Sequence, residues 1–387
     1  MKIFVTGIGA ITAIGGNVVE NLNSLRSLRT GLHKSSEYNL ITGEVSLTND
    51  QLSECFHLHD QNYSRTTLLS LPAAREAWGN NMRDCAIRTG LISSTSVGGM
   101  DRTEKYYFHD RRTNSPSHYH LMVHDNGTTT ELLAEELGIT GYISTISTAC
   151  SSGANSIMQA ARLMEAGRLD RVIAGGSEPL ALFDTMGFAS LNIYDPGFCK
   201  PFDENRKGLN LGEGAAFLVL ENEKSLSATG NHPICVLSGW NNASDAFHQT
   251  ASSPDGRGAY LAMIHALEKA GLSATEIDYV NAHGTGTVNN DLSESMALQK
   301  VFGKVPPFSS TKGFTGHTLA AAGAIEAVYC VMSISNQSIL PNINFVTSMH
   351  ETGLQPEKEF RPASIQHVLS NSFGFGGNCT SLVFSKS

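Results

Sequence analysis

A cysteine at a strand-to-helix junction is the residue in this sequence best placed to act as a nucleophile. Residues 143–161 read ISTISTACSSGANSIMQAA, in which the β-rich run Tyr142–Ser147 leads to Cys150 and then to small residues that begin a helix. Unpaired amide N–H groups and the positive end of a helix dipole stabilise a thiolate, so we expect a lowered pKa for Cys150. The same amides could bind an oxyanion. From this segment alone, a buried structural cysteine is the alternative interpretation.

Two histidines lie on loops that follow predicted strands. VNAHGTGT (280–287) places His283 at a strand end, and STKGFTGHTLAAAG (310–323) places Lys312 and His317 on a glycine-bracketed loop before a helix. Loops at strand ends carry functional side chains on a rigid α/β scaffold. One histidine alone is more often structural, but two on similar elements together with Cys150 favour catalysis. A fourth segment, NSFGFGGN (371–378), could approach a substrate closely and supply backbone N–H groups.

The elements that must position these residues alternate along the chain, which predicts an α/β fold. Strands are expected at Lys2–Thr6, Arg171–Ala174, Ala215–Leu220, Tyr279–Ala282 and Ser381–Phe384, and helices at Ser152–Ala166, Gly258–Ala270, Asp291–Phe302 and Leu319–Ser335. The polar segment Glu223–Pro233 is the best internal boundary, so we predict two packed halves, 1–229 and 230–387. The N-terminal TGIGAITAIG resembles a dinucleotide-binding loop but lacks the third glycine, which favours a plain strand and turn.

Composition excludes several classes of protein. The chain has 387 residues, 41% of them hydrophobic, and a net charge of −9 without a long basic run, so nucleic acid and anionic membranes are not expected partners. We expect no membrane span and no signal peptide, and therefore a cytoplasmic protein. The seven cysteines form no CxxC pair, which argues against a disulfide framework or a zinc site.

Taken together, these motifs resemble the elongating β-ketoacyl-acyl carrier protein synthases. TACSSG, NAHGTGT, STKGFTGHTLAAAG and NSFGFGG occur in the family's order and at its intervals, with supporting blocks such as VTGIGAIT and KPFDENRKGLNLGEGAAFLVLE, over nearly the whole chain. The resemblance implies a thiolase-like fold, in which two similar α/β halves form a five-layered αβαβα sandwich. It also implies a decarboxylative Claisen condensation between an acyl group and a malonyl thioester on acyl carrier protein, without cofactor or metal.

The resemblance further assigns roles to the candidate residues. Cys150 would hold the acyl chain, and its amide would form an oxyanion hole with that of Phe375, which would also gate the acyl pocket. His283 and His317 would hold the malonyl thioester carbonyl while CO₂ is lost.

Three further roles follow from the same resemblance. Lys312 would tune the site electrostatically, with Glu326 as its partner. Thr285 and Thr287 match the threonines that hold the pantetheine arm.

The resemblance leaves the partners and the product open. Members of the family carry several lysines and arginines in the first third of the chain for docking the carrier protein. The comparable stretch of this sequence, HDQNYSRTTLLSL, offers only Arg65. The dimer could be a homodimer or could pair with a related subunit. HGTGT and TACSS lean towards polyketide-type members over fatty-acid ones.

Several alternatives compete with this interpretation. A thiolase would need a second catalytic cysteine, for which Cys379 is the candidate, although a small buried residue at the start of the last strand explains it better. An initiating synthase would not have the second histidine at 317, and a non-catalytic chain-length subunit would have lost Cys150. The cluster SHYHLMVHD offers His118, His120 and His124 as metal ligands, but an interface helix is the favoured interpretation.

Overall fold

Ten strands of the described residues form one mixed sheet, and the two halves of this sheet repeat the same strand order. The computed structural model describes residues 1–55, 63–79, 86–110 and 118–387. The ten strands run β10-β9-β13-β14-β8-β1-β7-β6-β4-β5. The first half contains β1 (Phe4–Thr12), β4 (Thr89–Ser94), β5 (Tyr142–Ile146), β6 (Arg171–Glu178) and β7 (Gly214–Glu221), and the second contains β8 (Cys235–Ser244), β9 (Tyr279–Asn281), β10 (Phe308–Ser309), β13 (His367–Gly374) and β14 (Asn378–Ser385).

In each half, the first and the last strand along the chain are neighbours in the sheet. The other three strands lie beside the last one and are parallel to one another. β7 pairs antiparallel with β1 and β6, and β14 pairs antiparallel with β8 and β13. A short antiparallel pairing of β1 with β8, at Phe4 and Val5, joins the two halves. The carboxyl ends of the parallel strands therefore provide matching corners in both halves, and these corners carry the candidate catalytic residues.

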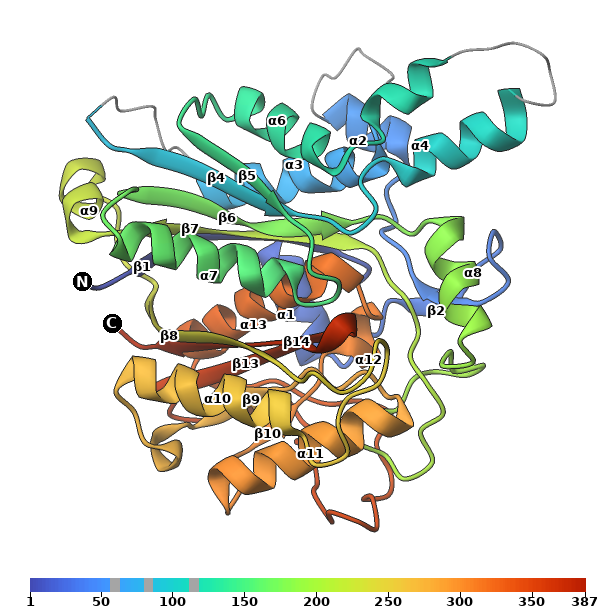
Figure 1. Cartoon of the computed structure of the whole chain (residues 1–387), viewed down its shortest axis with the longest axis vertical. Helices are drawn as coiled ribbons and strands as arrows, with labels where there is room; N and C mark the ends of the chain where they lie inside the picture. Colours follow the sequence, from blue (N-terminus) through green and yellow to red (C-terminus); the bar gives the residue numbers. More distant parts are fainter. Residues whose placement is uncertain (56–62, 80–85, 111–117) are drawn as a thin grey trace.

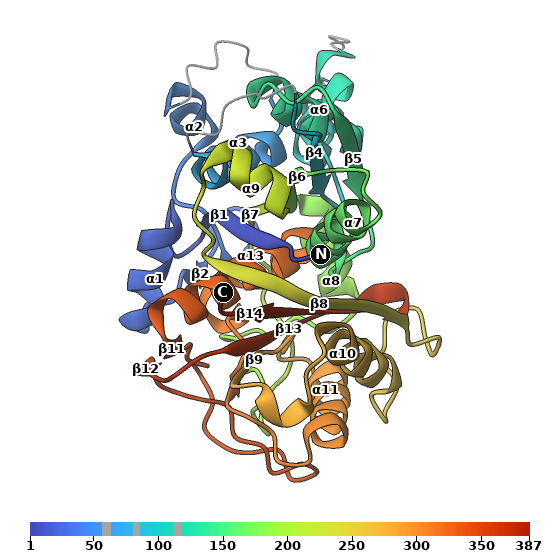
Figure 2. The same cartoon turned by 90° about the vertical axis from the view of Figure 1, so that its left-hand side faces the viewer.

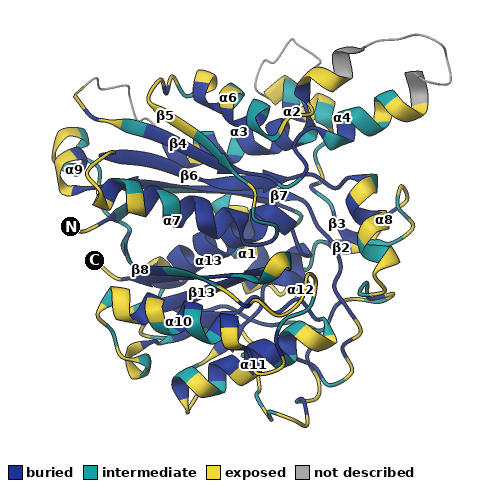
Figure 3. Cartoon of the chain, viewed as in Figure 1, coloured by how far each residue is buried: buried dark blue, intermediate teal, exposed yellow. Residues whose placement is uncertain are grey.

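Helices lie in three layers about the two halves of the sheet, which confirms the predicted αβαβα sandwich (Figure 1). The outer layers contain α3 (Arg65–Trp78) with α6 (Asn126–Glu136) and α10 (Arg257–Ala270) with α11 (Val288–Phe302), and the middle layer contains α7 (Ser152–Glu165) and α13 (Ala322–Asn336). The central strands β1, β6 and β7 and the helix α13 are largely buried, whereas the edge strand β5 and one face of each outer helix are exposed (Figure 3).

Shorter elements cover the ends and edges of the sandwich. The remaining helices are α1 (Val18–Arg26), α2 (Asn49–Cys55), α4 (Met100–Lys105), α8 (Leu182–Ser190), α9 (Glu223–Thr229) and α12 (Lys312–Thr315), with short turns η1 (Tyr106–Asp110), η2 (His118–Val123), η3 (Ala274–Glu276), η4 (Leu319–Ala321) and η5 (Phe375–Gly377). Two small ribbons pair β2 (Leu32–Lys34) with β3 (Ile41–Gly43) and β11 (Ser338–Ile339) with β12 (Arg361–Pro362).

The middle helices cross at a pair of glycines. A Cβ atom on Gly153 of α7 would lie 2.7 Å from the backbone N of Ala324, and one on Gly323 of α13 would lie 2.7 Å from the backbone N of Ala154. Only glycine permits so close a backbone approach. The crossing brings the first turns of α7 and α13 together, and with them the corners that precede these helices.

The glycines of the N-terminal motif serve packing. β1 continues through them, and a Cβ atom on Gly7 or Gly9 would lie 2.1 Å from the carbonyl oxygen of Ala77 or Ala73 on α3. The motif is thus a strand packed tightly against a helix, as the missing third glycine indicated.

The segment Leu319–Asn336 is long and apolar enough to cross a membrane, but 89% of it is buried inside the protein. It comprises η4 and α13 and forms the middle of the sandwich (Figure 2). Its apolar composition is explained by its place in the core.

We propose the end of α9 as the division between the two halves. α9 follows the last strand of the first half, and Gly230 (φ 70°) ends it in a left-handed conformation before β8. The division at 229/230 predicted from the sequence lies at this point.

Candidate active site

Cys150 lies on a strained corner between β5 and α7. Ala149, directly before it, has φ 51°, a left-handed conformation that costs a non-glycine residue about 1–2 kcal/mol. Ser152 holds the corner closed, because its hydroxyl accepts a hydrogen bond from the N–H of Thr148 (2.8 Å) and donates to the carbonyl of Ala149 (2.5 Å). Cys150 itself is buried, with 5% of its surface exposed.

Burial raises the pKa of the Cys150 thiol to about 12, against the opposing effects of Lys312 and the N–H of Phe375. The expectation of a lowered pKa was therefore wrong in direction. The helix terminus is present, but removing the thiolate from water outweighs it. The thiol is the resting form, so it gives up its proton only in the course of a reaction.

His283 is held by its backbone at the end of β9. The carboxylate of Glu294, on α11, accepts hydrogen bonds from the N–H groups of His283 (2.9 Å) and Gly284 (2.8 Å). Asn371 of β13 donates to the same carboxylate at 3.0 Å. The sequence did not identify Glu294, because a glutamate within a helix carries no distinctive signal.

His317 follows β10 and has a ring without hydrogen-bond partners. Its backbone N–H donates to the carbonyl of Asn210 at 2.7 Å, which fixes the loop. Among the described residues, both ring nitrogens are buried and lack a partner. The ring of His283 lies at a centroid distance of 5.2 Å and an angle of 83°. Buried nitrogens without partners are costly, so this pair is suited to a polar ligand.

Lys312 determines which nitrogen of His283 carries the proton. Its ammonium lies 3.2 Å from Nδ1 of His283 and 2.5 Å from the His283 carbonyl oxygen, and it forms a buried ion pair with Glu326. An ammonium can only donate, so Nδ1 accepts and the proton of the neutral ring is on Nε2. Burial, and after it the charge of Lys312, lowers the pKa of both His283 and His317 well below the usual range. Both rings are therefore neutral donors at neutral pH.

One cavity of about 320 Å³ brings the predicted substrate-contacting residues together. Its walls include Cys150, His283, His317, Thr285, Thr287 and Phe375. Lys312 and Glu326 lie behind the histidines rather than on the wall. Burial raises the pKa of Glu326 to about 7, while Lys312 opposes that shift.

Phe375 closes one side of the cavity. Its ring stacks on that of Phe188 from α8 at 5.6 Å and 19°, and it is followed by Gly376 (φ 83°) and Gly377 (φ 77°). Phe188 was not predicted, because its segment contains no motif. Thr285 and Thr287 lie on the opposite loop with their hydroxyls 2.9 Å apart, and Thr287 caps the N-terminus of α11.

Arg65 is not available for docking. Its guanidinium forms a two-pronged ion pair with Glu213, at 2.7 and 2.5 Å, and only 17% of its side chain is exposed. The basic residue noted in the sequence is thus a structural one, because it holds α3 against the start of β7.

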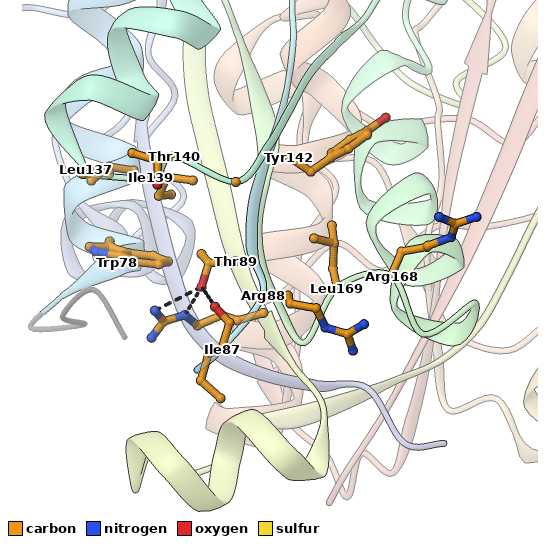
Figure 4. A pocket seen from close by; sticks show the side chains of 13 residues that line it. Trp78, Ile87, Arg88, Thr89, Leu137, Ile139, Thr140, Tyr142, Arg168 and Leu169 are labelled. Carbon is orange, nitrogen blue, oxygen red and sulfur yellow. Dashed lines mark hydrogen bonds between the residues drawn. The ribbon is translucent and has the colours of Figure 1, made fainter. Parts of the chain in front are cut away.

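The remaining candidates from the sequence are the histidine cluster and Cys379. The side chains of His118 and His120 lie outside the described residues, and the residues that are described contain no group of three potential metal ligands. Cys379 is buried near the start of β14 and lines the same cavity as Cys150. A second pocket of about 440 Å³, at the amino ends of β4, β5 and β6, is lined by Trp78 and Thr89, among others (Figure 4), and Cys150 is not part of its wall.

Comparison with known proteins agrees with this arrangement. Residues 1–225 match the N-terminal domain, and residues 234–346 the C-terminal domain, of beta-ketoacyl synthases. The chain is 32% identical to 3-oxoacyl-[acyl-carrier-protein] synthase 2 of Staphylococcus aureus (100% of this chain, 98% of the relative) and 32% identical to a putative mitochondrial 3-oxoacyl-[acyl-carrier-protein] synthase of Schizosaccharomyces pombe (100% and 99%).

Solved structures point to the same family. The ishigamide ketosynthase/chain length factor superimposes with a TM-score of 0.93 at 27% identity (100% and 99% covered). The ketosynthase ApeO of Xenorhabdus doucetiae, in complex with its chain length factor ApeC, gives 0.87 at 33% (100% and 98%). The chain therefore belongs to the beta-ketoacyl synthase family, the acyltransferases that extend fatty-acid and polyketide chains by Claisen condensation.

Proposed function

We propose that this chain condenses an acyl group held on Cys150 with a malonyl thioester carried by acyl carrier protein, with loss of CO₂, to give a β-ketoacyl-carrier protein. The observation that supports this most directly is the shared cavity, where a buried thiol faces two neutral imidazoles. Acyl transfer needs the thiol and decarboxylation needs the imidazoles, so one cavity can serve both steps.

In the first step, Cys150 attacks the acyl thioester of a carrier protein. The new C–S bond forms first and gives a tetrahedral oxyanion, which the N–H groups of Cys150 and Phe375 stabilise. The bond to the carrier sulfur then breaks, and the proton of Cys150 ends on the departing sulfur. Because the thiol is protonated at rest, this proton transfer is part of the reaction.

In the second step, His283 and His317 donate hydrogen bonds to the thioester carbonyl of the malonyl group. The bond to the carboxylate breaks, CO₂ leaves, and the electron pair is held as an enolate at that carbonyl. The enolate carbon attacks the acyl carbon on Cys150, whose sulfur leaves as thiolate and takes a proton from water. Lys312, paired with Glu326, keeps the proton of His283 on Nε2 for this donation.

The remaining wall residues serve the long substrates. Thr285 and Thr287 present their hydroxyls to the pantetheine arm, whose amides need hydrogen-bond partners. Phe375 and Phe188 form a stacked pair that must part for a long acyl chain to reach Cys150. Glycines after Phe375 give its loop the freedom to move.

Acyl carrier protein is the proposed carrier of both substrates, and a related subunit is the proposed partner. One solved relative is a type II polyketide synthase ketosynthase in complex with its acyl carrier protein, and ApeO pairs with ApeC. Here β5 is one of the two edge strands of the sheet, with Tyr142 and Ile143 exposed on it, and Phe183 and Met186 of α8 are exposed apolar residues as well. We infer a dimer through this edge, with a second copy or a related subunit, in the cytoplasm.

Separate assays of the two half-reactions test the proposal. Cys150→Gln should abolish chain extension but retain CO₂ release from malonyl-carrier protein. His283→Ala and His317→Ala should lower CO₂ release by about a hundredfold, as the loss of one oxyanion-type donor usually does, and should affect acylation of Cys150 less. If Cys150→Gln loses CO₂ release as fully as the histidine variants, the proposed division of roles is wrong.

Acyl labelling tests the thiolase alternative. After incubation with an acyl thioester and digestion, the acyl mass should be on the peptide that contains Cys150. Label on Cys379 would support a thiolase instead.

A further inference from the structure

Asn378 lies where the two halves of the site meet, and its side-chain oxygen is shared among three neighbours. It is the first residue of β14 and comes directly after η5, which carries Phe375. Its Oδ1 lies 2.7 Å from the hydroxyl of Ser151, 2.8 Å from Nδ2 of Asn155 and 2.7 Å from Nδ2 of Asn242. Ser151 and Asn155 belong to the Cys150 corner and its helix, whereas Asn242 lies on β8.

The neighbours are themselves linked into a closed polar network. Asn155 donates to the hydroxyl of Thr148 at 2.8 Å and accepts from that of Thr380 at 2.8 Å, and Asn242 donates to Thr380 at 2.7 Å. The hydroxyl of Ser151 also lies 2.8 Å from the carbonyl of Thr148. A network with this degree of hydrogen bonding is rigid.

The two proposed oxyanion donors come from opposite sides of this network. The N–H of Cys150 belongs to the first half of the chain, and the N–H of Phe375 belongs to the second. The backbones meet at Gly374, where a Cβ atom would lie 2.8 Å from the carbonyl oxygen of Thr148 and 3.2 Å from the N of Cys150. The two backbone segments touch there without a side chain between them. The hydrogen bonds beside Gly374 therefore determine how far apart the two N–H groups lie.

We propose that Asn378 is a positioning residue that fixes the spacing between the N–H of Cys150 and the N–H of Phe375. It acts through Ser151 and Asn155, and it is not part of the cavity wall. The inference rests on the proposed function and assigns Asn378 to the acyl-transfer step alone. The histidine pair is held separately, His283 by Glu294 and Lys312 and His317 by the hydrogen bond of its backbone N–H to the carbonyl of Asn210.

The test compares the two half-reactions in Asn378→Ala. Acyl transfer to Cys150 should slow by about tenfold to a hundredfold, less than the full loss of a donor, with the KM for the acyl-carrier substrate unchanged. CO₂ release from malonyl-carrier protein is compared between the single variant Cys150→Gln and the double variant that also carries Asn378→Ala. The two rates should differ by less than about twofold. Equal losses in both half-reactions would contradict the assignment.

Asn378→Asp separates positioning from mere stability. The carboxylate keeps an accepting oxygen for all three donors, so acyl transfer should recover to within a few fold of the unchanged protein. Its negative charge beside the Cys150 corner disfavours the thiolate, so the pH profile of acyl transfer should shift upward. A destabilised but otherwise unaltered site would show neither the recovery nor the shift.

Two further variants complete the design. Asn222→Ala removes a buried asparagine outside the network, the N-cap of α9, and should lower thermal stability without slowing acyl transfer. If Asn378→Ala does not fold, Asn242→Ala removes one donor and should give a smaller loss of the same kind. If the wild-type protein is active and Asn378→Ala is fully active as well, the role of Asn378 is overturned and the proposed function stands. If the wild-type protein is inactive in both half-reactions, the proposed function itself is overturned.

Discussion

Burial shifts the pKa of the nucleophile and the pKa values of the histidine pair in opposite directions. It raises the pKa of Cys150 and lowers the pKa values of His283 and His317, because in each case it disfavours the charged form. All three residues are therefore neutral in the empty cavity. A neutral donor pair suits an enolate, while a neutral thiol limits side reactions until a thioester arrives.

The raised pKa of Cys150 predicts a distinct alkylation profile. Well below its pKa, the thiolate fraction of a thiol increases tenfold with each pH unit, so the rate of alkylation by iodoacetamide should increase by about that factor per pH unit from pH 7 to pH 10, without a plateau. Peptide mass spectrometry can follow Cys150 separately, with the exposed Cys55 as an internal reference. A plateau near neutral pH would indicate a thiolate at rest and would contradict the burial argument.

The histidines predict a flat pH profile for decarboxylation. Since their pKa values are lowered, they become charged only well below pH 6.5, and the donating neutral form is present above that. The histidines should therefore give no step in CO₂ release by Cys150→Gln between pH 6 and pH 8, and a step in this range would come from Glu326, whose pKa is raised to about 7 and which pairs with Lys312. A fall on acidification through pH 6.5 that persists when Glu326→Gln is added would show that an imidazole titrates there.

At the scale of elements, the crossing of α7 and α13 aligns the corners. Gly153→Ala would place its Cβ atom against the backbone of Ala324, and overpacking of this kind costs about 1–3 kcal/mol. Urea denaturation should show that loss, with slower acyl transfer because the Cys150 corner begins α7. Gly187→Ala is the matched control: Gly187 is exposed in α8 with no atom within 4 Å of its Cβ position, so it should stabilise by about 0.5–1 kcal/mol. A tolerated Gly153→Ala would mean that the helices can move apart.

The corners were predictable from the sequence, but their supports were not. Cys150 and His283 each follow a β-rich run and precede small residues, and His317 lies on a glycine-bracketed loop before a helix, all of which the sequence displays directly. Glu294 and Asn378 act on partners distant along the chain, and their own neighbours give no sign of this. The pKa of Cys150 was misjudged for the same reason, because the sequence displays the helix terminus but not the walls that exclude water.

The elements themselves differ in how clearly the sequence marks them. β6, β7 and α7 were expected within a few residues of their ends, since each is an uninterrupted apolar or amphipathic run. β8 and β13 were not expected, because their sequences CVLSGWNNAS and HVLSNSFG mix polar residues into the strand. Those polar residues contribute Asn242 and Asn371 to the hydrogen bonds behind the site.

At the scale of the molecule, the two halves share one core. The central hydrophobic cluster includes Ile157 of α7 and Val328 of α13, which belong to different halves. Neither half can bury this surface alone, so we expect a single cooperative unfolding transition. The chain contains two tryptophans, Trp78 in the first half and Trp240 in the second, and both are buried.

Variants with one tryptophan each can test this cooperativity. In Trp78→Phe the fluorescence of Trp240 reports on the second half, and in Trp240→Phe that of Trp78 reports on the first. In each variant, the fluorescence midpoint in urea should coincide with the midpoint from circular dichroism of the whole chain. Separate midpoints would show that the halves unfold independently.

The repeated strand order has a consequence for ancestry. A strand order that occurs twice in one chain is what a duplicated and fused gene would leave. Cys150 follows the third strand of the first half, and His317 follows the third strand of the second half. While the two copies were identical, they would have carried the same residue at both positions, so a thiol could not have faced an imidazole there. A duplicated gene allows each copy to mutate independently, so the asymmetric chemistry could evolve only after the duplication.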